Sequence, residues 1–337
     1  MEALHSTYKT DAKGVLWATN NPTGKAGLIG IDKLGDAIRF FDPTSLAEEK
    51  VIALKNHHEV AISPDHKFAF ASEFGKFAGG HFIESGAHIT VLDLATKDVV
   101  RRIPTGPYKG PHAMRFGADG SLWVIFEETG ELGRLDCETL ELVETFEIGA
   151  ENGRPPFIEV TPDGRKIYVS CKLGSLIVFD TETRSVVATI AVPKGTEGIA
   201  ISPDGSRLYA AENTRQDLLV IDAASDKIAG KIELKGAVLS NPKTSRLIRM
   251  RFSPDGAWLV STNYASGVMH IHDGANPADH VLIPIAKGPQ GIAFPADENH
   301  VLVSNHDCGL ITRVDLATAR ALECVPAGKG IEALTYY

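Results

Sequence analysis

The sequence repeats one short turn signal seven times, at intervals of 42 to 51 residues. In each copy an apolar or mixed pair precedes an aspartate, and three residues later comes a serine or threonine, or Asn276 in the sixth copy. Side chains of these types bond nearby backbone groups, which suits a tight corner between two strands. The seven aspartates are Asp42, Asp93, Asp136, Asp180, Asp222, Asp273 and Asp315. An internal period of this size is typical of a repeat fold.

A second turn signal, most often Pro-Asp or Asp-Gly after an apolar stretch, alternates with the first. Its six aspartates are Asp65, Asp119, Asp163, Asp204, Asp255 and Asp297. An apolar segment follows each copy, as expected for the second strand of a hairpin. Each repeat therefore predicts four short strands, which is the content of one propeller blade.

The first turn signal occurs seven times and the second six times. The strands predicted at the two ends of the chain account for this difference. The N-terminal region predicts three strands at Val15–Asn20, Ala37–Phe41 and Lys50–Leu54, with no inner strand before them. The segment Glu332–Tyr337 predicts an inner strand with nothing after it. Joining these segments closes the ring without an open sheet edge. We predict an all-β fold, with residues 1–337 forming a single seven-bladed β-propeller domain of four-stranded antiparallel blades.

The repeat resembles the YVTN family of propellers. The match is carried by Glu159–Ile190 (EVTPDGRKIYVSCKLGSLIVFDTETRSVVATI) and Ile199–Ile232 (IAISPDGSRLYAAENTRQDLLVIDAASDKIAGKI), and it extends over nearly the whole chain. Propellers of this group include lactonase-like enzymes, muconate-cyclising enzymes and nitrous-oxide-reductase-like copper domains. The resemblance therefore implies the fold but does not choose among these activities.

Charge and hydropathy limit the partners and the compartment. The net charge is −9 and no run of lysine and arginine occurs, which argues against nucleic acid or an anionic membrane as partner. No apolar stretch is long enough to span a bilayer, and residues 1–10 lack the features of a signal peptide. We expect a soluble cytoplasmic protein, or a periplasmic or secreted one if a leader has been removed.

Polar residues gather where the inner strands of the predicted blades begin. Counting seven residues back from each aspartate of the second signal gives His58, His112, Pro156, Glu197, Ile248 and Gln290, which Glu332 joins in the last strand. The adjoining strand ends at the same face of each blade, and it contributes Glu73, Glu212, Asn263 and Asn305, with His306 one step later. Such variety at one repeat position predicts a small-molecule site at the axial mouth, the alternative being a polar, water-filled channel.

Two kinds of chemistry suit this ring. His58, His112, Glu197 and Glu332 could bind one divalent ion of Zn, Mn, Fe or Cu, which accept mixed nitrogen and oxygen ligands. Without a metal, the same four residues could act as acids and bases. We expect Gln290 and Arg249 to orient the substrate together with Glu73, Glu212, Asn263, Asn305 and His306. Arg249 could instead form an ion pair between blades. The insertion at Phe74–His88 is expected to be a loop that shapes the mouth.

These observations predict an enzyme acting on a small molecule, of the lactone hydrolase, lyase or cycloisomerase type. The competing hypothesis is a non-catalytic module that binds a protein partner on its flat face. A third possibility comes from the pair His57 and His58, which together with His112 resembles the paired histidines of copper-containing selenium-binding propellers. That resemblance implies a copper-dependent, oxidase-like activity.

Overall fold

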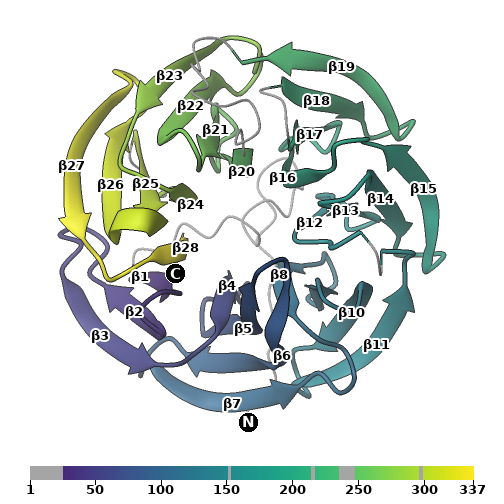
Figure 1. Ribbon diagram of the computed structural model, residues 1–337, viewed down its shortest axis with the longest axis horizontal. Helices are drawn as coiled ribbons and strands as arrows, with labels where there is room; N and C mark the ends of the chain where they lie inside the picture. The colour runs from purple at the N-terminus through teal and green to yellow at the C-terminus, as the bar shows by residue number, and fades with distance from the viewer. Residues whose placement is uncertain (1–25, 151–152, 214–216, 235–246, 296–298) are drawn as a thin grey trace.

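Seven four-stranded antiparallel sheets form a closed ring in the computed structural model (Figure 1). The structure describes residues 26–150, 153–213, 217–234, 247–295 and 299–337. Within these residues six blades are built from consecutive strands, and the closing blade has the order β28-β1-β2-β3. The prediction of an all-β seven-bladed propeller is therefore confirmed.

The blades follow the chain around the ring, each running from the axis outward. The closing blade and the second blade contain β28 (Ile331–Tyr336), β1 (Leu28–Asp32), β2 (Ala37–Phe41), β3 (Glu48–Ala53), β4 (His57–Ile62), β5 (Phe68–Ala78), β6 (His81–Asp93) and β7 (Asp98–Pro104). The third and fourth blades contain β8 (Pro111–Phe116), β9 (Leu122–Phe126), β10 (Glu131–Asp136), β11 (Glu141–Glu147), β12 (Ile158–Val160), β13 (Lys166–Ser170), β14 (Ser175–Asp180) and β15 (Ser185–Ala191).

The remaining three blades repeat the same arrangement. They contain β16 (Thr196–Ile201), β17 (Arg207–Glu212), β18 (Asp217–Asp222), β19 (Lys227–Glu233), β20 (Leu247–Phe252), β21 (Trp258–Asn263), β22 (Val268–Asp273), β23 (His280–Pro284), β24 (Pro289–Ala293), β25 (His300–Asn305), β26 (Leu310–Asp315) and β27 (Arg320–Pro326). A short 3-10 turn, η3 (His306–Cys308), follows β25.

The outer turns use their aspartates as the sequence predicts. Asp93 Oδ1 accepts hydrogen bonds from the backbone N–H groups of Ala95 (3.0 Å) and Thr96 (2.8 Å). In the sixth copy Asp273 Oδ1 accepts from the N–H groups of Ala275 (2.9 Å) and Asn276 (2.8 Å). Because the bond to the third residue comes from its backbone, asparagine replaces threonine there without loss of the turn.

The inner turns depend on a serine or threonine, an aspartate and a left-handed residue. In the fifth blade Ser202 Oγ donates to Asp204 Oδ1 (2.6 Å), and the backbone N–H of Arg207 donates to Ser202 Oγ (2.9 Å). Gly205 has φ +72°, a region that glycine enters without steric cost. His66 occupies the equivalent place in the second blade with φ +59°, which is costly for a residue with a side chain.

The closing blade corrects one predicted strand. Its second strand is β1 (Leu28–Asp32), which pairs with β28 from Leu28↔Tyr336 to Asp32↔Ile331. The segment Val15–Asn20, predicted for this place, lies outside the described residues. All five residues of β1 are buried, so they lack the alternation of polar and apolar side chains that reveals a half-exposed strand. Closure between the two ends of the chain is confirmed.

The insertion after β5 is a hairpin extension, and the prediction of a loop is wrong. Strands β5 and β6 continue past the blade and meet at Gly79 (φ +62°) and Gly80 (φ +87°). The extension brings Phe74, which is buried, to the inner edge of the second blade. This placement makes the insertion part of the wall described below.

Candidate active site at the axial mouth

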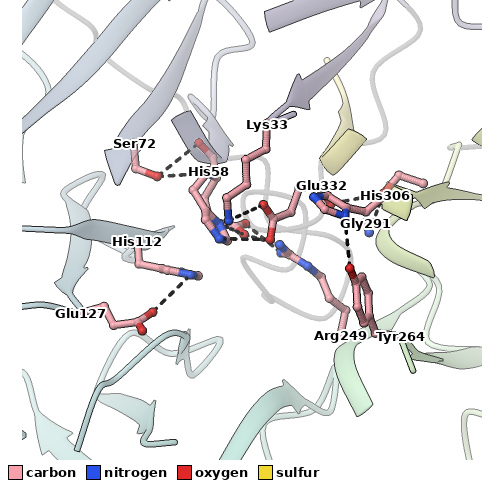
Figure 2. Close-up of polar contacts among 12 residues, drawn as sticks. Lys33, His58, Ser72, His112, Glu127, Arg249, Tyr264, Gly291, His306 and Glu332 are labelled. Atoms are coloured by element: carbon pink, nitrogen blue, oxygen red, sulfur yellow. Dashed lines mark hydrogen bonds and ion pairs between the residues drawn. The ribbon is translucent and has the colours of Figure 1, made fainter. Parts of the chain in front are cut away.

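The inner strands carry an irregularity at the same end in five blades. The pairing register shifts between His57 and Val60, Pro111 and Met114, Thr196 and Ile199, Leu247 and Arg249, and Pro289 and Ile292. A bulge re-aims side chains that would otherwise alternate between two faces. This explains why the successive residues His58 and Glu59 both face the interior of the ring, His58 in the lining of the cavity described next (Figure 2) and Glu59 beside Arg249.

A cavity of about 260 Å³ lies at this end of the axis. Six of the seven predicted inner-strand positions line it: His58, His112, Pro156, Glu197, Gln290 and Glu332. The seventh, Ile248, lies where the side chain is not described. Other blades and the hairpin extension complete the wall with Lys33, Leu34, Phe74, Phe77, Arg154, Phe157, Lys172, Tyr264 and His306. The predicted register therefore does converge on one space.

His58 lies between two carboxylates on the cavity wall. Its Nε2 is 3.0 Å from Glu332 Oε1, and its Nδ1 is 3.3 Å from Glu59 Oε1. Lys33 Nζ also contacts Glu332, at 2.9 Å from Oε2. Burial alone would raise the pKa of Glu332, but the charges of His58 and Lys33 hold it well below its ordinary value. Glu332 is therefore an anion at neutral pH.

His112 is the most unusual group in the cavity. Its ring centroid is 4.1 Å from that of His58, and the rings of Phe74 and Phe157 lie at 5.1 and 5.2 Å. Burial lowers the pKa of His112 well below its ordinary value, and the charge of His58 lowers it further. Its Nδ1 has no hydrogen-bond partner among the described residues. A neutral imidazole with an unpaired nitrogen is suited to accept a proton or to bind a metal.

Glu127 lies behind His112 and forms ion pairs with two cations. Glu127 Oε2 is 3.5 Å from His112 Nε2. Arg154 Nη2 and Lys172 Nζ each contact Glu127 Oε1, at 2.7 Å. The two cations carry two positive charges against one carboxylate, which leaves one excess positive charge in this wall. Arg154 also covers the ring of Phe77, 4.1 Å from its centroid.

Below the histidines, Glu59 and Arg249 form a buried ion pair across the axis. Arg249 Nη1 donates to Glu59 Oε2 at 2.8 Å, and Nη2 donates to Glu59 Oε1. The ring of Phe157 lies 4.9 Å from the Arg249 guanidinium carbon. Burial would raise the pKa of Glu59, but Arg249 and His58 lower it to about 2. Burial would likewise lower the pKa of Arg249, and the charge of Glu59 raises it.

The predicted residues fall into two groups by position. Among those expected to orient a substrate, Gln290 and His306 line the cavity, and His306 Nδ1 lies 3.3 Å from the Tyr264 hydroxyl. Glu73, Glu212, Asn263, Asn305 and Arg249 are not part of its lining. Glu73 instead pairs with Arg102, and the Asn305 side chain accepts from Thr312 Oγ1 at 2.6 Å. Arg249 forms the inter-blade ion pair that the sequence left open.

The predicted metal ligands are brought together only in part. Among the described residues, His58, Glu59 and His112 form a group whose ligand atoms lie within 4.8 Å of one another. Glu197 and Glu332 do not belong to that group. Glu59 is bound by Arg249 and His58 by Glu332, whereas His112 Nδ1 is open. A metal would therefore have to displace two existing ion pairs, and metal binding here stays a prediction.

Several residues in and around the cavity wall were not predicted from the sequence. Glu127 follows β9 at the place where Glu73 follows the core of β5, so the repeat could have identified it. Lys33, Arg154 and Lys172 come from connections between strands, which the repeat does not align. Phe74 was within the predicted insertion but was not singled out. Glu59 directly follows His58 in the chain, but its partner Arg249 lies 190 residues away and could not be predicted from spacing.

No protein-family model matches the chain. Dihydro-heme d1 dehydrogenase of Pseudomonas aeruginosa is 24% identical over 269 residues, which cover 65% of this chain and 54% of that protein. The chain thus spans about half the length of this relative. Hydrazine synthase of Kuenenia stuttgartiensis matches with a TM-score of 0.71 at 16% identity, covering 97% of this chain and 99% of that chain.

The structural similarity to hydrazine synthase shows that the two chains share a fold. The likeness to two enzymes is distant in both comparisons, and the YVTN resemblance of the repeat is not matched by a family model. In the part of the chain that the structure describes, no helix has the length and hydropathy to cross a bilayer.

Proposed function

We propose that this propeller is an enzyme that binds a small carboxylate-bearing lactone at its axial mouth and hydrolyses it by acid–base catalysis. The observation that carries the proposal is His112, a buried neutral imidazole with an unpaired nitrogen in a cavity whose lining includes Arg154 and Lys172. Buried polar atoms without partners need an explanation, and a bound ligand supplies one.

One side of the cavity favours a carboxylate. Arg154 and Lys172 share the single carboxylate of Glu127, whereas Glu197 and the Lys33–Glu332 pair lie elsewhere in the lining. Gln290 Oε1 is a second buried atom without a hydrogen-bond partner among the described residues, and it can accept from a hydroxyl or a water. Phe74, Phe77 and Phe157 give the apolar surface that most small-molecule sites contain.

The chemistry follows from the protonation states. A water molecule adds to the lactone carbonyl as its proton passes to His112 Nδ1, so that no free hydroxide forms. Lys172 binds the substrate carboxylate, and Arg154 stabilises the negative charge that develops on the carbonyl oxygen. Collapse of the intermediate breaks the ring C–O bond, and the leaving alkoxide takes the proton back from His112. One water is consumed and one hydroxy acid is formed.

The test is turnover of muconolactone and other carboxylated γ-lactones, followed by proton release, with neutral γ-butyrolactone as the comparison substrate. We expect hydrolysis of carboxylated lactones by the wild type, and loss of kcat by about 10²- to 10⁴-fold in His112→Asn, the usual contribution of a general base. The matched control is His66→Asn, at an exposed histidine in a distant turn. Equal rates in wild type and His112→Asn would refute the assignment of His112.

A second candidate is favoured by the sequence likeness to dihydro-heme d1 dehydrogenase. It is oxidation of a reduced tetrapyrrole, which gives up two electrons and two protons to an external electron acceptor. The carboxylates of the tetrapyrrole would meet the same cations. Titration with heme d1 or its dihydro form, followed by visible absorbance, separates the two candidates. A spectral change that His112→Asn and Lys172→Met abolish, without lactone turnover in the wild type, would favour the tetrapyrrole.

A further inference from the structure

One repeat position on the inner strands carries charged residues in three blades. It lies four residues before the aspartate of the inner turn and holds Arg115 on β8, Glu159 on β12 and Arg251 on β20. In the other blades the same position holds a small residue: Ala61, Ala200 and Ala293, with Thr335 in the closing strand. Long charged side chains therefore stand beside short ones here, and the short ones leave space around the axis.

A second cavity, of about 30 Å³, lies among the inner strands and is called the arginine cavity below. Arg115, Arg249 and Arg251 line it together with Glu59, and the rest of its lining is glycine and apolar residues. Of the described residues, only Phe157 also lines the cavity at the mouth, so the two spaces are separate. A volume of this size holds about two water-sized groups.

Two of the three arginines already have a carboxylate partner. Arg249 pairs with Glu59, as described above. Arg115 donates from Nη2 and Nε to Glu159 Oε1, at 2.9 and 3.1 Å. The side chain of Arg251 has no hydrogen bond or ion pair among the described residues. Three guanidinium groups therefore meet two carboxylates, and the positive charge of Arg251 is left without a counter-ion.

The surroundings of Arg251 disfavour its charge. Burial and the charge of Arg115 lower the pKa of Arg251 to about 10, although Glu159 raises it. Arg251 is still a cation at neutral pH, because this pKa lies well above 7. The carboxylates of the mouth, Glu197 and Glu332, line the other cavity and not this one. A charge removed from water without a partner is costly, and a counter-ion in the arginine cavity would remove that cost.

We propose that the arginine cavity binds one small monovalent anion beside Arg251, with chloride as the expected ion. One negative charge balances the single unpaired guanidinium, and the small volume excludes a substrate-sized carboxylate. A guanidinium is weakly hydrated and has several donors, which suits it to bind anions away from bulk water. The ion pairs of Arg115 and Arg249 stay intact, because the free donors are those of Arg251. This site does not rest on the proposed function at the mouth.

The anion would connect blades that are far apart in the chain. Arg115 belongs to the third blade and Arg251 to the sixth, and their strands β8 and β20 lie on different sides of the axis (Figure 1). The site exists only when the ring is closed. An anion bound there therefore favours the folded state over the unfolded chain, by mass action.

The test is thermal unfolding of the wild type, Arg251→Met and Arg101→Met in sodium chloride and in sodium sulfate at matched ionic strength. Sulfate is the comparison anion because a tetrahedral oxyanion is too large for the arginine cavity. Arg101 is exposed on the outer strand β7, so its variant loses the same charge from the surface. We expect the melting temperature to rise with chloride concentration in the wild type and in Arg101→Met, and not in Arg251→Met. In sulfate, Arg251→Met should be at least as stable as the wild type, since it lacks the uncompensated charge.

Two results would overturn the proposal. One is a chloride-dependent rise of equal size in the wild type and in Arg251→Met. The other is a wild type whose melting temperature rises no more in chloride than in sulfate. Bromide, a halide that anomalous scattering locates in crystals, gives a check that needs no variant. One bromide ion beside Arg251 is expected in the wild type, and bromide at surface positions alone would contradict the site.

Discussion

The Glu59–Arg249 pair makes a quantitative prediction about stability. Removing the guanidinium with Arg249→Met leaves the Glu59 carboxylate buried beside His58 and without its main counter-ion. The pKa of Glu59 is about 2 in the fold against an ordinary value of 4.5, a difference of 2.5 that corresponds to about 3 kcal/mol. Breaking a buried pair from one side costs about 3–5 kcal/mol. We therefore expect Arg249→Met to lower the unfolding free energy by about 3–5 kcal/mol at pH 7.

A double-mutant cycle separates the ion pair from packing. Glu59→Gln/Arg249→Met removes both charges, so it should be more stable than Arg249→Met alone, with a coupling energy of about 3 kcal/mol. Urea is the denaturant, because it is uncharged and leaves the ionic strength unchanged across the titration.

The pH dependence has a definite sign. Because the pKa of Glu59 is lowered in the fold, its contribution is complete above pH 4.5 and is lost as the pH falls toward about 2. About 2 kcal/mol of it should be gone at pH 3. A coupling energy below about 0.5 kcal/mol at pH 7, or one that does not decline on acidification, would refute the reasoning.

Three further predictions concern single residues. Substituting Leu334→Ala in the closing strand, where the side chain is buried between the first and last blades, should cost about 2–5 kcal/mol in urea unfolding; a loss under 1 kcal/mol would mean that the closure contributes little. His66→Gly should raise stability by roughly 1 kcal/mol, since glycine accepts φ +59° freely, and a loss would contradict the strain. Gly164→Ala should lower stability, because φ is +74° and the new Cβ would lie 2.6 Å from Ala118 Cβ; an unchanged melting temperature would count against this contact.

Most of the fold could be predicted because its turns are local. The aspartates of the outer turns accept hydrogen bonds from backbone N–H groups two and three residues away, so each turn is determined by a few adjacent residues. The prediction failed at β1 (Leu28–Asp32) because the inner strand of this blade is β28, about 300 residues away in the chain. The closing blade therefore lacks the Pro-Asp turn that marks the start of the second strand in the other blades.

The mouth was predicted where it follows the repeat and missed where it does not. His58, His112, Glu197, Gln290 and Glu332 occupy one repeat position, so a register count found them together. Lys33, Arg154 and Lys172 lie in irregular connections, and only the folded chain shows that two of them share Glu127. Glu59 and Arg249 form their ion pair across the axis, and the spacing of the repeat does not predict which residues meet there.

The measurement that tests the central claim most directly is calorimetric titration of the best carboxylated lactone, or its ring-opened acid, into the wild type, Lys172→Met and Lys227→Met. Lys172 lines the cavity, whereas Lys227 is exposed on an outer strand, so the two variants lose the same charge in different places. We expect the affinity for the ligand to fall by about 10-fold or more in Lys172→Met, as for loss of a charged hydrogen bond. The affinity should be unchanged in Lys227→Met. Equal affinity in all three proteins, or no binding of any carboxylated ligand to the wild type, would contradict the claim.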